Sequence, residues 1–227
     1  MSADSRLPSS AQTGVHEQLP VLLARHLAAP FRKPYADYNR LAFDASQSRR
    51  ERIAPHAPLI LDAGCGVGES SIALARAFPD HYVIGVDQSA SRLGRNIDSK
   101  AGGLPPNLDL VRADLVDYWR LLHDAGIRLE RHYLLYPNPW PKIGHLGRRW
   151  HGHPVFPGLL ALGGVLECRS NWRLYIEELC CALTLATGRQ ATPENWSPAV
   201  PLTPFERKYQ ASGHPLYRVS FPLAPPL

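Results

Sequence analysis

Apolar residues along the chain fall into two patterns, short continuous runs and stretches that repeat every three or four positions. The short runs bounded by turn residues predict buried strands, and the repeating stretches predict helices. We expect strands at 59–61, 82–86, 108–112, 132–136, 165–169, 203–209 and 216–221. We expect helices at 16–29, 69–78, 89–100, 115–124, 155–162 and 172–186.

From residue 58 onward, strands and helices alternate, and this order predicts an α/β fold. Such alternation is typical of a mostly parallel sheet, here seven-stranded, with helices on both faces. In sheets of this kind, ligands bind beyond the carboxyl ends of the strands. The residues that directly follow each predicted strand are therefore the first candidates for a functional site.

The first 57 residues contain too few apolar side chains to form a core of their own. Residues 1–14 are small and polar, which predicts disorder, and one helix is expected before Pro30 and Pro34. We interpret 1–57 as an N-terminal extension and 58–227 as one domain. The extension holds 8 Lys and Arg against 5 Asp and Glu, a charge of +3, which suits either an RNA-binding arm or a solvated segment.

Composition narrows the class of protein. The chain of 227 residues is 44% hydrophobic and 20% charged, which is typical of a globular protein. It has no apolar run near the roughly 18–20 residues that span a membrane and no apolar signal-peptide stretch. We expect a cytoplasmic protein without membrane contact. Its net charge of +5 permits a polyanionic partner.

Cysteine spacing argues against a metal or disulfide framework. The four cysteines include one adjacent pair and no C-x-x-C motif. His151 and His153 lack a clear third ligand nearby in the sequence. No metal site is predicted.

The first predicted strand of the domain ends in Asp62-Ala63-Gly64-Cys65-Gly66-Val67-Gly68. Glycines let the backbone turn sharply and approach a ligand closely. A dinucleotide fingerprint reads G-x-G-x-x-G, whereas here the third glycine comes one position early. Glu69 also follows where a pyrophosphate would sit, and its charge would repel one. The loop therefore favours a ligand with an amine and no phosphate over the cofactor of an NAD-dependent dehydrogenase.

Two further acids follow strands. Asp87 ends the second strand, 25 residues after Asp62, where a carboxylate can accept the hydroxyls of a ribose. Asp114 follows the third strand, where an adenine edge could be read. Each acid could instead form a turn or cap a helix, but all of them around one glycine loop favour a ligand site.

With these residues, the chain resembles the class I S-adenosylmethionine-dependent methyltransferases. The resemblance implies a Rossmann-like class I methyltransferase fold and S-adenosylmethionine as the cofactor. It implies that the glycine loop contacts the methionine part, that the second-strand acid binds the ribose and that the third-strand acid lies by the adenine. The implied cofactor residues are Asp62, Gly64, Gly66, Gly68, Asp87, Asp114 and Asn138.

Three later blocks resemble the bacterial tRNA (guanine-N7) methyltransferase family. They are Tyr136-Pro137-Asn138-Pro139-Trp140-Pro141-Lys142, then Asn171-Trp172 with Tyr175, and then Thr203-Pro204-Phe205-Glu206-Arg207 followed by Gly213-His214-Pro215. With the glycine loop, the resemblance covers about 58–221. It implies tRNA as a partner, with Asn138 as the catalytic residue. The implied substrate-binding residues are Lys142, Asn171, Thr203, Pro204, Phe205 and Glu206.

Basic and aromatic residues fit that substrate. Arg148 and Arg149, like Lys142, are positioned to neutralise phosphates, although they could also only solvate a loop. Trp140 could stack on a base or anchor the loop in the core. The oligomeric state stays open between a monomer and a homodimer.

Asn138 and Asn171 depart from the family, which has Asp at both positions. Guanine N7 carries a lone pair and no proton, so no base is needed, but methylation leaves the ring cationic. An amide favours that charge less than a carboxylate does, which could cost on the order of 10²–10³ in rate. We therefore expect guanine-N7 methylation by a weakened enzyme or one in which Glu206 compensates. The alternatives are transfer to an exocyclic amine of nucleic acid or of a small molecule, or an inactive tRNA-binding relative.

Overall fold

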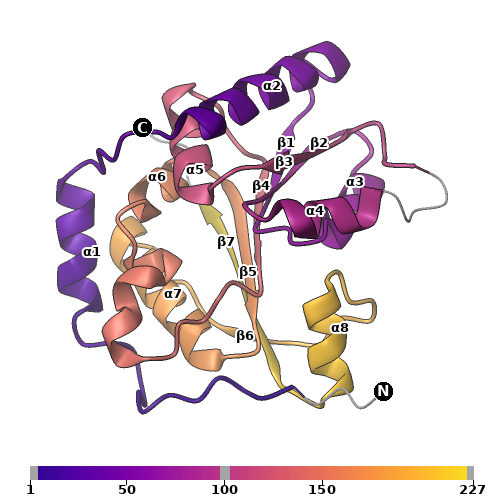
Figure 1. Ribbon diagram of the computed structural model, residues 1–227. Coiled ribbons are helices and arrows are strands. Elements are labelled where there is room, and N and C mark those ends of the chain that lie inside the picture. Colours follow the sequence, from indigo (N-terminus) through magenta and orange to yellow (C-terminus); the bar gives the residue numbers. More distant parts are fainter. Residues whose placement is uncertain (1–4, 98–102, 224–227) are drawn as a thin grey trace. The chain divides into compact units, whose positions relative to one another are not determined.

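The computed structural model describes residues 5–97 and 103–223. Within these ranges seven strands form one sheet in the order β3-β2-β1-β4-β5-β7-β6 (Figure 1). The strands are β1 Leu59–Ala63, β2 Tyr82–Asp87, β3 Leu108–Arg112, β4 Arg131–Leu135, β5 Gly164–Ser170, β6 Glu194–Trp196 and β7 Leu216–Leu223. The α-helices are α1 Leu19–Ala28, α2 Asp37–Ile53, α3 Glu69–Ala77, α4 Ala90–Ile97, α5 Leu115–Asp124, α6 Phe156–Ala161, α7 Arg173–Thr187 and α8 Pro204–Ala211.

The chain divides into two compact units. One unit contains the chain up to Arg32 together with Tyr136–Leu160 and Glu167–Phe221. The other contains the described residues of Lys33–Leu135, together with Ala161–Leu166, Pro222 and Leu223. We call them the loop unit and the glycine unit, after the predicted site residues that each one carries.

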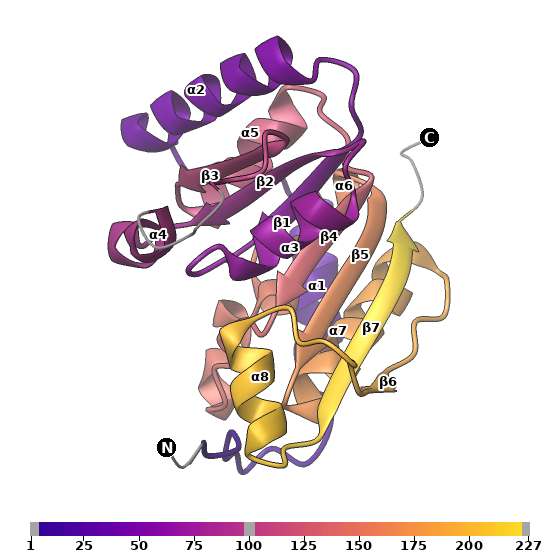
Figure 2. The same cartoon turned by 90° about the vertical axis from the view of Figure 1, so that its right-hand side faces the viewer.

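The glycine unit holds the parallel strands. β1 pairs in parallel with both β2 and β4, and β2 pairs in parallel with β3. Figure 2 shows α3 and α4 over one face of these strands and α2 and α5 over the other. Right-handed crossovers explain the arrangement, because the chain reverses direction across the sheet after β3. Every residue of β1 and β2 is buried, as expected for strands covered on both sides.

The loop unit contains the antiparallel pair β6 and β7 and the long helix α7. Helix α1 packs against α7 and against the short 3₁₀ helix Trp150–Gly152. A second 3₁₀ helix, Ile143–Arg148, precedes it in the segment where a loop is predicted.

The fold prediction is confirmed, because the structure has a seven-stranded, mostly parallel sheet with helices. The predicted strand at 203–209 is wrong. That segment is helix α8, and the edge strand β6 lies earlier, at Glu194–Trp196. Thr203 caps the helix by accepting a hydrogen bond from the Glu206 N–H, and Pro204 suits the first turn. Thr203, Pro204 and Glu206 are typical of a helix start, and this pattern outweighs the weak apolar pattern that predicts a strand here.

The extension holds two helices rather than the single one expected. Helix α2 was missed because its buried face is mostly polar, with Asn39, Ser46 and Gln47 beside Phe43. A hydrophobic pattern cannot identify a helix that buries amides and a hydroxyl.

The prediction of disorder for residues 1–14 is wrong for the described part. Ser10 and Gln12 both make hydrogen bonds to residues more than 100 positions away. Residues 1–4 and the end of the helix predicted to reach residue 100 lie outside the described ranges. Among the described residues, no helix has the length and apolar character needed to cross a membrane.

Candidate functional site

The glycine loop after β1 depends on backbone conformations that side chains disfavour. Gly64, Gly66 and Gly68 have φ angles of 78°, 60° and 77°. These lie in the left-handed region, where a Cβ is costly. The N–H groups of Gly64 and Cys65 both donate to the Val86 carbonyl at the end of β2. The loop is thereby tied to the neighbouring parallel strand.

Asp62 fastens β1 to the start of α3. Its Oδ2 accepts hydrogen bonds from the hydroxyls of Ser70 at 2.6 Å and Ser71 at 2.7 Å, and the side chain is buried. Gly85 on β2 makes room for this cluster, because a Cβ there would lie 2.2 Å from Ser71 Oγ. The two serines were not predicted as site residues. By binding Asp62, they help to orient the start of the loop. A pair of hydroxyl residues in the first turn of the following helix is the sequence signal that could have identified them.

Asp87 holds the loop from the end of β2. Its Oδ2 accepts from the Gly66 N–H at 3.0 Å and its Oδ1 accepts from the Ser89 N–H at 2.8 Å. The Arg92 guanidinium lies 3.6 Å from Oδ2. Each carboxylate oxygen has a further lone pair, so Asp87 keeps the capacity to accept ribose hydroxyls.

Asp114 caps α5, because its Oδ1 accepts from the Val116 N–H at 2.8 Å. Its own N–H donates to Oδ1 of Asn39, a buried residue of α2 that also donates to Asp117. The helix that sequence reasoning missed thus positions a predicted cofactor residue. A lone polar residue in a polar helix gave no signal of this role.

The residues of the glycine loop fit S-adenosylmethionine. A Cβ built on Gly66 meets no atom within 4 Å, so there is open space where a ligand can approach the backbone. The Asp87 carboxylate hydrogen-bonds the N–H of that same glycine. Burial raises the pKa of the Cys65 thiol, which stays protonated and gives the loop no additional negative charge beside a cationic ligand.

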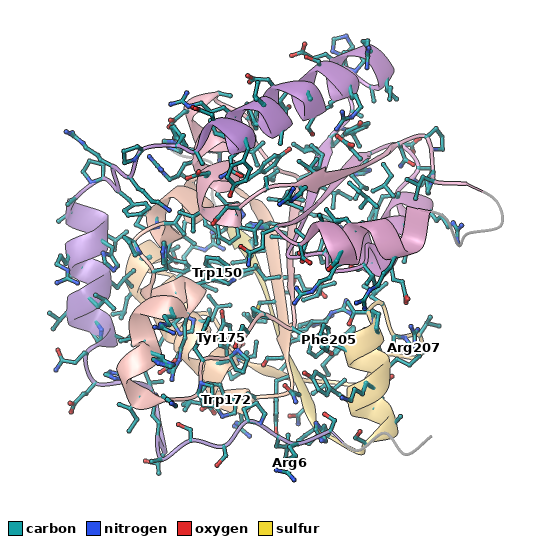
Figure 3. The ribbon with its side chains drawn as sticks, viewed as in Figure 1. Arg6, Trp150, Trp172, Tyr175, Phe205 and Arg207 are labelled. Atoms are coloured by element: carbon teal, nitrogen blue, oxygen red, sulfur yellow. The ribbon has the colours of Figure 1, made fainter. Side chains whose placement is uncertain are left out.

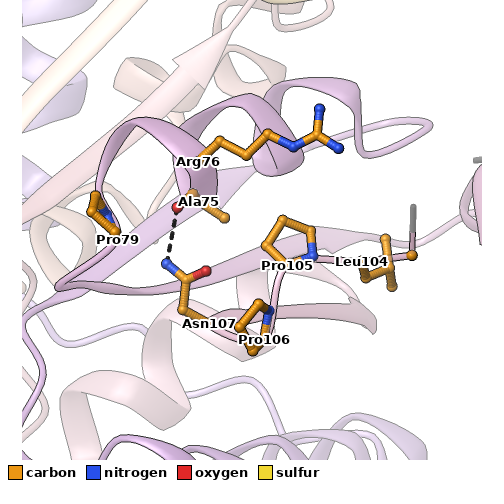
Figure 4. Close-up of a pocket in the computed structure, with 8 residues that line it drawn as sticks. Ala75, Arg76, Pro79, Leu104, Pro105, Pro106 and Asn107 are labelled. Atoms are coloured by element: carbon orange, nitrogen blue, oxygen red, sulfur yellow. Dashed lines mark hydrogen bonds between the residues drawn. The ribbon is translucent and has the colours of Figure 1, made fainter. Parts of the chain in front are cut away.

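A surface pocket of the same unit lies elsewhere. It is lined by Ala75, Arg76, Pro79, Gly103, Leu104, Pro105, Pro106 and Asn107 (Figure 4). Asn107 closes one side by donating to the carbonyl of Ala75. These residues lie in the last turn of α3, just after α3 or just before β3, so the pocket opens at the amino ends of the strands. The glycine loop and Asp87 lie at the carboxyl ends, and we assign the pocket no part in the site.

The loop unit carries the segment Tyr136–Lys142, which we call the acceptor loop. Tyr136 and Trp140 have φ angles of 55° and 46°, which are uncommon for residues with side chains. Asn138 lies exposed between them, and its Oδ1 accepts from the Trp140 N–H at 3.3 Å. A strained loop at a functional position indicates that the surrounding structure holds it there.

Lys142 and Arg148 are both exposed, as a phosphate contact requires. The Arg148 guanidinium lies 4.9 Å from the centre of the Trp140 ring, whose edge also meets His145. One face of Trp140 is therefore engaged within the protein.

The prediction that Arg149 contacts phosphate is wrong. Its side chain has no exposed surface and its Nη1 lies 2.5 Å from Oε2 of Glu178, which is equally buried. Its guanidinium also lies 5.0 Å above the ring of Trp172, labelled in Figure 3 together with Tyr175. Neighbouring arginines in a basic run have opposite environments here, which the sequence alone does not distinguish.

Glu206 is likewise buried and committed to internal partners. Its carboxylate accepts from Tyr136 Oη at 2.7 Å, Arg169 Nη1 at 3.0 Å, Trp196 Nε1 at 3.0 Å and the Leu202 N–H at 2.6 Å. This contradicts the prediction that its side chain binds substrate or compensates for an amide. Burial and the bond to Glu206 both raise the pKa of Tyr136, which stays a hydrogen-bond donor.

The remaining predicted residues lie around this cluster. Thr203 is buried as the cap of α8, whereas Pro204 and Phe205 are exposed, Phe205 by 52% (Figure 3). The Phe205 ring stacks on Tyr209, which in turn stacks on His214. Asn171 is buried, and its Nδ2 lies 3.2 Å from Nδ1 of His214.

Comparison with known proteins supports the interpretation of this chain as a methyltransferase. Residues 56–219 match the model of a family described as "Putative methyltransferase". A "tRNA (guanine-N(7)-)-methyltransferase" of Saccharophagus degradans is 30% identical over 200 residues, covering 84% of this chain and 86% of that protein. One from Pseudomonas savastanoi pv. phaseolicola is 32% identical over 176 residues, covering 73% and 70%.

Solved structures share the fold at lower identity. The 16S rRNA methyltransferase KamB aligns with a TM-score of 0.57 and 18% identity, covering 85% of this chain and 96% of that one. The antibiotic-resistance methyltransferase Kmr aligns with a TM-score of 0.55 and 22% identity, covering 82% and 94%.

The fold and the glycine loop define this protein as a class I, S-adenosylmethionine-dependent methyltransferase. The family match covers most of the parallel sheet. It also covers the three blocks at 136–142, 171–175 and 203–215, which we call the acceptor-side blocks. The chain belongs to the tRNA (guanine-N7)-methyltransferase family, as a divergent member with Asn138 and Asn171 in its acceptor-side blocks.

Proposed function

We propose that this protein transfers the methyl group of S-adenosylmethionine to N7 of a guanine in tRNA. The observation that carries the proposal is the convergence of the three acceptor-side blocks in one unit. The Tyr136 hydroxyl binds Glu206, and Asn171 contacts His214, so segments 43 or more positions apart share one cluster. Relatives that are 30% and 32% identical over 84% and 73% of this chain bear the tRNA (guanine-N(7)-)-methyltransferase name.

Charge around the acceptor loop supports an RNA substrate. Lys142 and Arg148 are exposed beside it, and Lys208 is exposed on α8. Cations of this kind neutralise backbone phosphates and position the nucleic acid. The exposed ring of Phe205 offers a surface on which an unpaired base can stack.

The chemistry asks little of the acceptor side beyond alignment. S-adenosylmethionine supplies an electrophilic methyl group when it is bound. Guanine N7 has a lone pair and no proton, so the chain needs no general base at that atom. In this proposal Asp87 and the glycine backbone hold the cofactor, and the amide oxygen of Asn138 offers partial negative charge to the base as it becomes cationic.

The proposal assigns the activity to residues 58–227, preceded by the extension 1–57. It assigns the protein to the cytoplasm, where tRNA is available, as a monomer or homodimer. An exocyclic amine remains the second candidate acceptor, because the Asn138 oxygen can accept a hydrogen bond from an N–H₂ group.

The decisive experiment incubates the purified protein with S-adenosylmethionine and tRNA that lacks 7-methylguanosine. The tRNA is then digested and its nucleosides are analysed by mass spectrometry. We expect new 7-methylguanosine. A different methylated nucleoside would favour the exocyclic amine, and no product from a protein that binds the cofactor would refute transfer to tRNA.

A matched variant measures the contribution of the amide. Asn138→Asp restores the family's carboxylate, and we expect kcat to rise by about 10²-fold because a negative charge favours the cationic ring. Asn138→Ala is the control that removes the polar group. A fall in kcat for Asn138→Asp, with Asn138 itself active, would show that the acceptor needs the N–H₂ donor of the amide, which a carboxylate lacks.

A further inference from the structure

The N-terminal segment 5–16 lies against the elements of the loop unit that hold the acceptor loop. We call it the strap. In Figure 1 it runs as an extended indigo trace below α7 before it reaches α1. At its start, the Ser5 carbonyl lies 2.7 Å from Nε2 of His214, the residue that contacts Asn171. The strap therefore touches one acceptor-side block at its first described residue.

Further along, the strap binds the acceptor loop directly. The Ser10 hydroxyl donates to the Pro141 carbonyl at 2.6 Å. Pro141 lies between Trp140, which has the left-handed φ angle, and the exposed Lys142. The Pro141 carbonyl thus receives its donor from Ser10, across 131 positions of sequence.

The strap also reaches the loop through a buried ion pair. Gln12 Nε2 donates to Glu178 Oε1 at 2.6 Å, and Arg149 Nη1 donates to Gln12 Oε1 at 3.1 Å. Glu178 further accepts from the His16 N–H and lies 2.9 Å from Nε2 of His151. Burial raises the pKa of Glu178, but hydrogen bonds from His151, Gln12 and Arg149 outweigh it and hold the pKa at about 2.

Arg149 connects Glu178 and Gln12 to the backbone of the acceptor loop through further hydrogen bonds. Its Nε and Nη2 donate to the Trp140 carbonyl at 3.3 and 3.1 Å, and Nη2 lies 3.5 Å from the Lys142 carbonyl. Together with Ser10, these bonds hold three consecutive carbonyls of the acceptor loop. A non-glycine residue at positive φ persists only where the surroundings fix it, and these contacts provide that constraint for Trp140.

We propose that Ser10 and Gln12 are positioning residues that set the acceptor loop for its substrate. The strap fixes the backbone around Asn138 and Lys142 without touching the acceptor itself. The effect on tRNA methylation rests on the proposed function, whereas the effect on the loop backbone does not. The strap is thus a working part of the acceptor side rather than a solvated tail.

The test uses four single alanine variants and one double variant of the full chain. Ser10→Ala and Gln12→Ala remove the two contacts, and the exposed Ser9→Ala and Gln18→Ala are matched controls of the same residue types. Hydrogen exchange is followed at the His145 amide, which donates to the Lys142 carbonyl. We expect the Ser10→Ala/Gln12→Ala double variant to exchange about 5- to 30-fold faster there, with the cofactor Kd close to wild type.

Activity supplies the second readout. We expect the double variant to lose about 10- to 100-fold in kcat/KM for tRNA, because a small displacement of positioning groups is costly. Ser10→Thr, in an otherwise unchanged chain, keeps the hydroxyl and should retain most of the activity that Ser10→Ala loses. Unchanged exchange at the His145 amide, or equal changes in the controls, would overturn the proposal that the strap positions the acceptor loop. If wild type methylates no tRNA, the exchange measurement still decides the strap while the proposed function fails.

Discussion

The glycine loop and the acceptor loop are two backbone turns held by different means. The glycine loop is fixed by near neighbours, since Gly66 donates to Asp87 and Gly64 donates to Val86, both within 22 positions. The acceptor loop is held by Arg149 nearby and also from a distance, by Ser10 at 131 positions and by Glu206 at 70. Both turns use positive φ angles, but only the first builds them from glycine.

The difference shows two ways to stabilise an unfavourable backbone. Glycine adopts the left-handed region without a steric penalty, so the first loop needs few supporting contacts. Tyr136 and Trp140 pay that penalty, and side chains from distant segments offset it. The first loop should therefore be sensitive to its own residues, and the second to residues far from it in the sequence.

The largest effect is expected in the glycine loop itself. Gly66→Val adds a β-branched side chain at a φ of 60° and fills the open space beside the backbone. We expect the Kd for S-adenosylmethionine, measured by calorimetry, to rise by more than about 100-fold. Gly94→Val is the control, because Gly94 lies in α4 with nothing within 4 Å of its Cβ position. Normal binding by Gly66→Val would contradict the assignment of this loop.

The next effect separates two neighbouring arginines of the acceptor side. Arg149→Met leaves the buried Glu178 carboxylate without its cation, and we expect the free energy of unfolding to fall by about 3–5 kcal/mol. Arg148→Met should change it by less than about 0.5 kcal/mol, because Arg148 is exposed. Urea denaturation measures both.

The salt dependence of tRNA binding should change more in Arg148→Met than in Arg149→Met, the reverse of the order in stability. Loss of one phosphate contact in Arg148→Met should reduce the slope of log K against log salt by about 1. Equal stability losses in the two variants would show that Arg149 is not buried in its pair with Glu178.

The smallest effect tests whether the glycine unit also depends on a distant helix. Asn39→Ala removes the acceptor for the Asp114 N–H and a donor to Asp117. We expect a loss of about 1–3 kcal/mol in unfolding free energy and a weaker affinity for the cofactor. Ser48→Ala, at an exposed position of the same helix, should leave both unchanged. If Asn39→Ala left the free energy of unfolding unchanged, α5 alone and not α2 would hold Asp114 in place.

The sequence by itself determined the sheet of the glycine unit and the position of its loop. Strands of continuous apolar residues such as Leu59-Ile60-Leu61 have one stable location, buried between two helical layers. The G-x-G-x-G turn, with Asp87 beyond the next strand, follows from local backbone requirements. Local patterns sufficed here because the forces that act are themselves local.

Only the tertiary structure decided which polar residues are buried. Arg148 and Arg149 are adjacent and chemically identical, yet one is exposed and the other pairs with Glu178. Helix α2 and the strap both depend on polar contacts, which carry no hydrophobic period. A buried hydrogen bond requires its partner in place, and the partner of Ser10 lies 131 positions away, so the fold must form before that bond can exist.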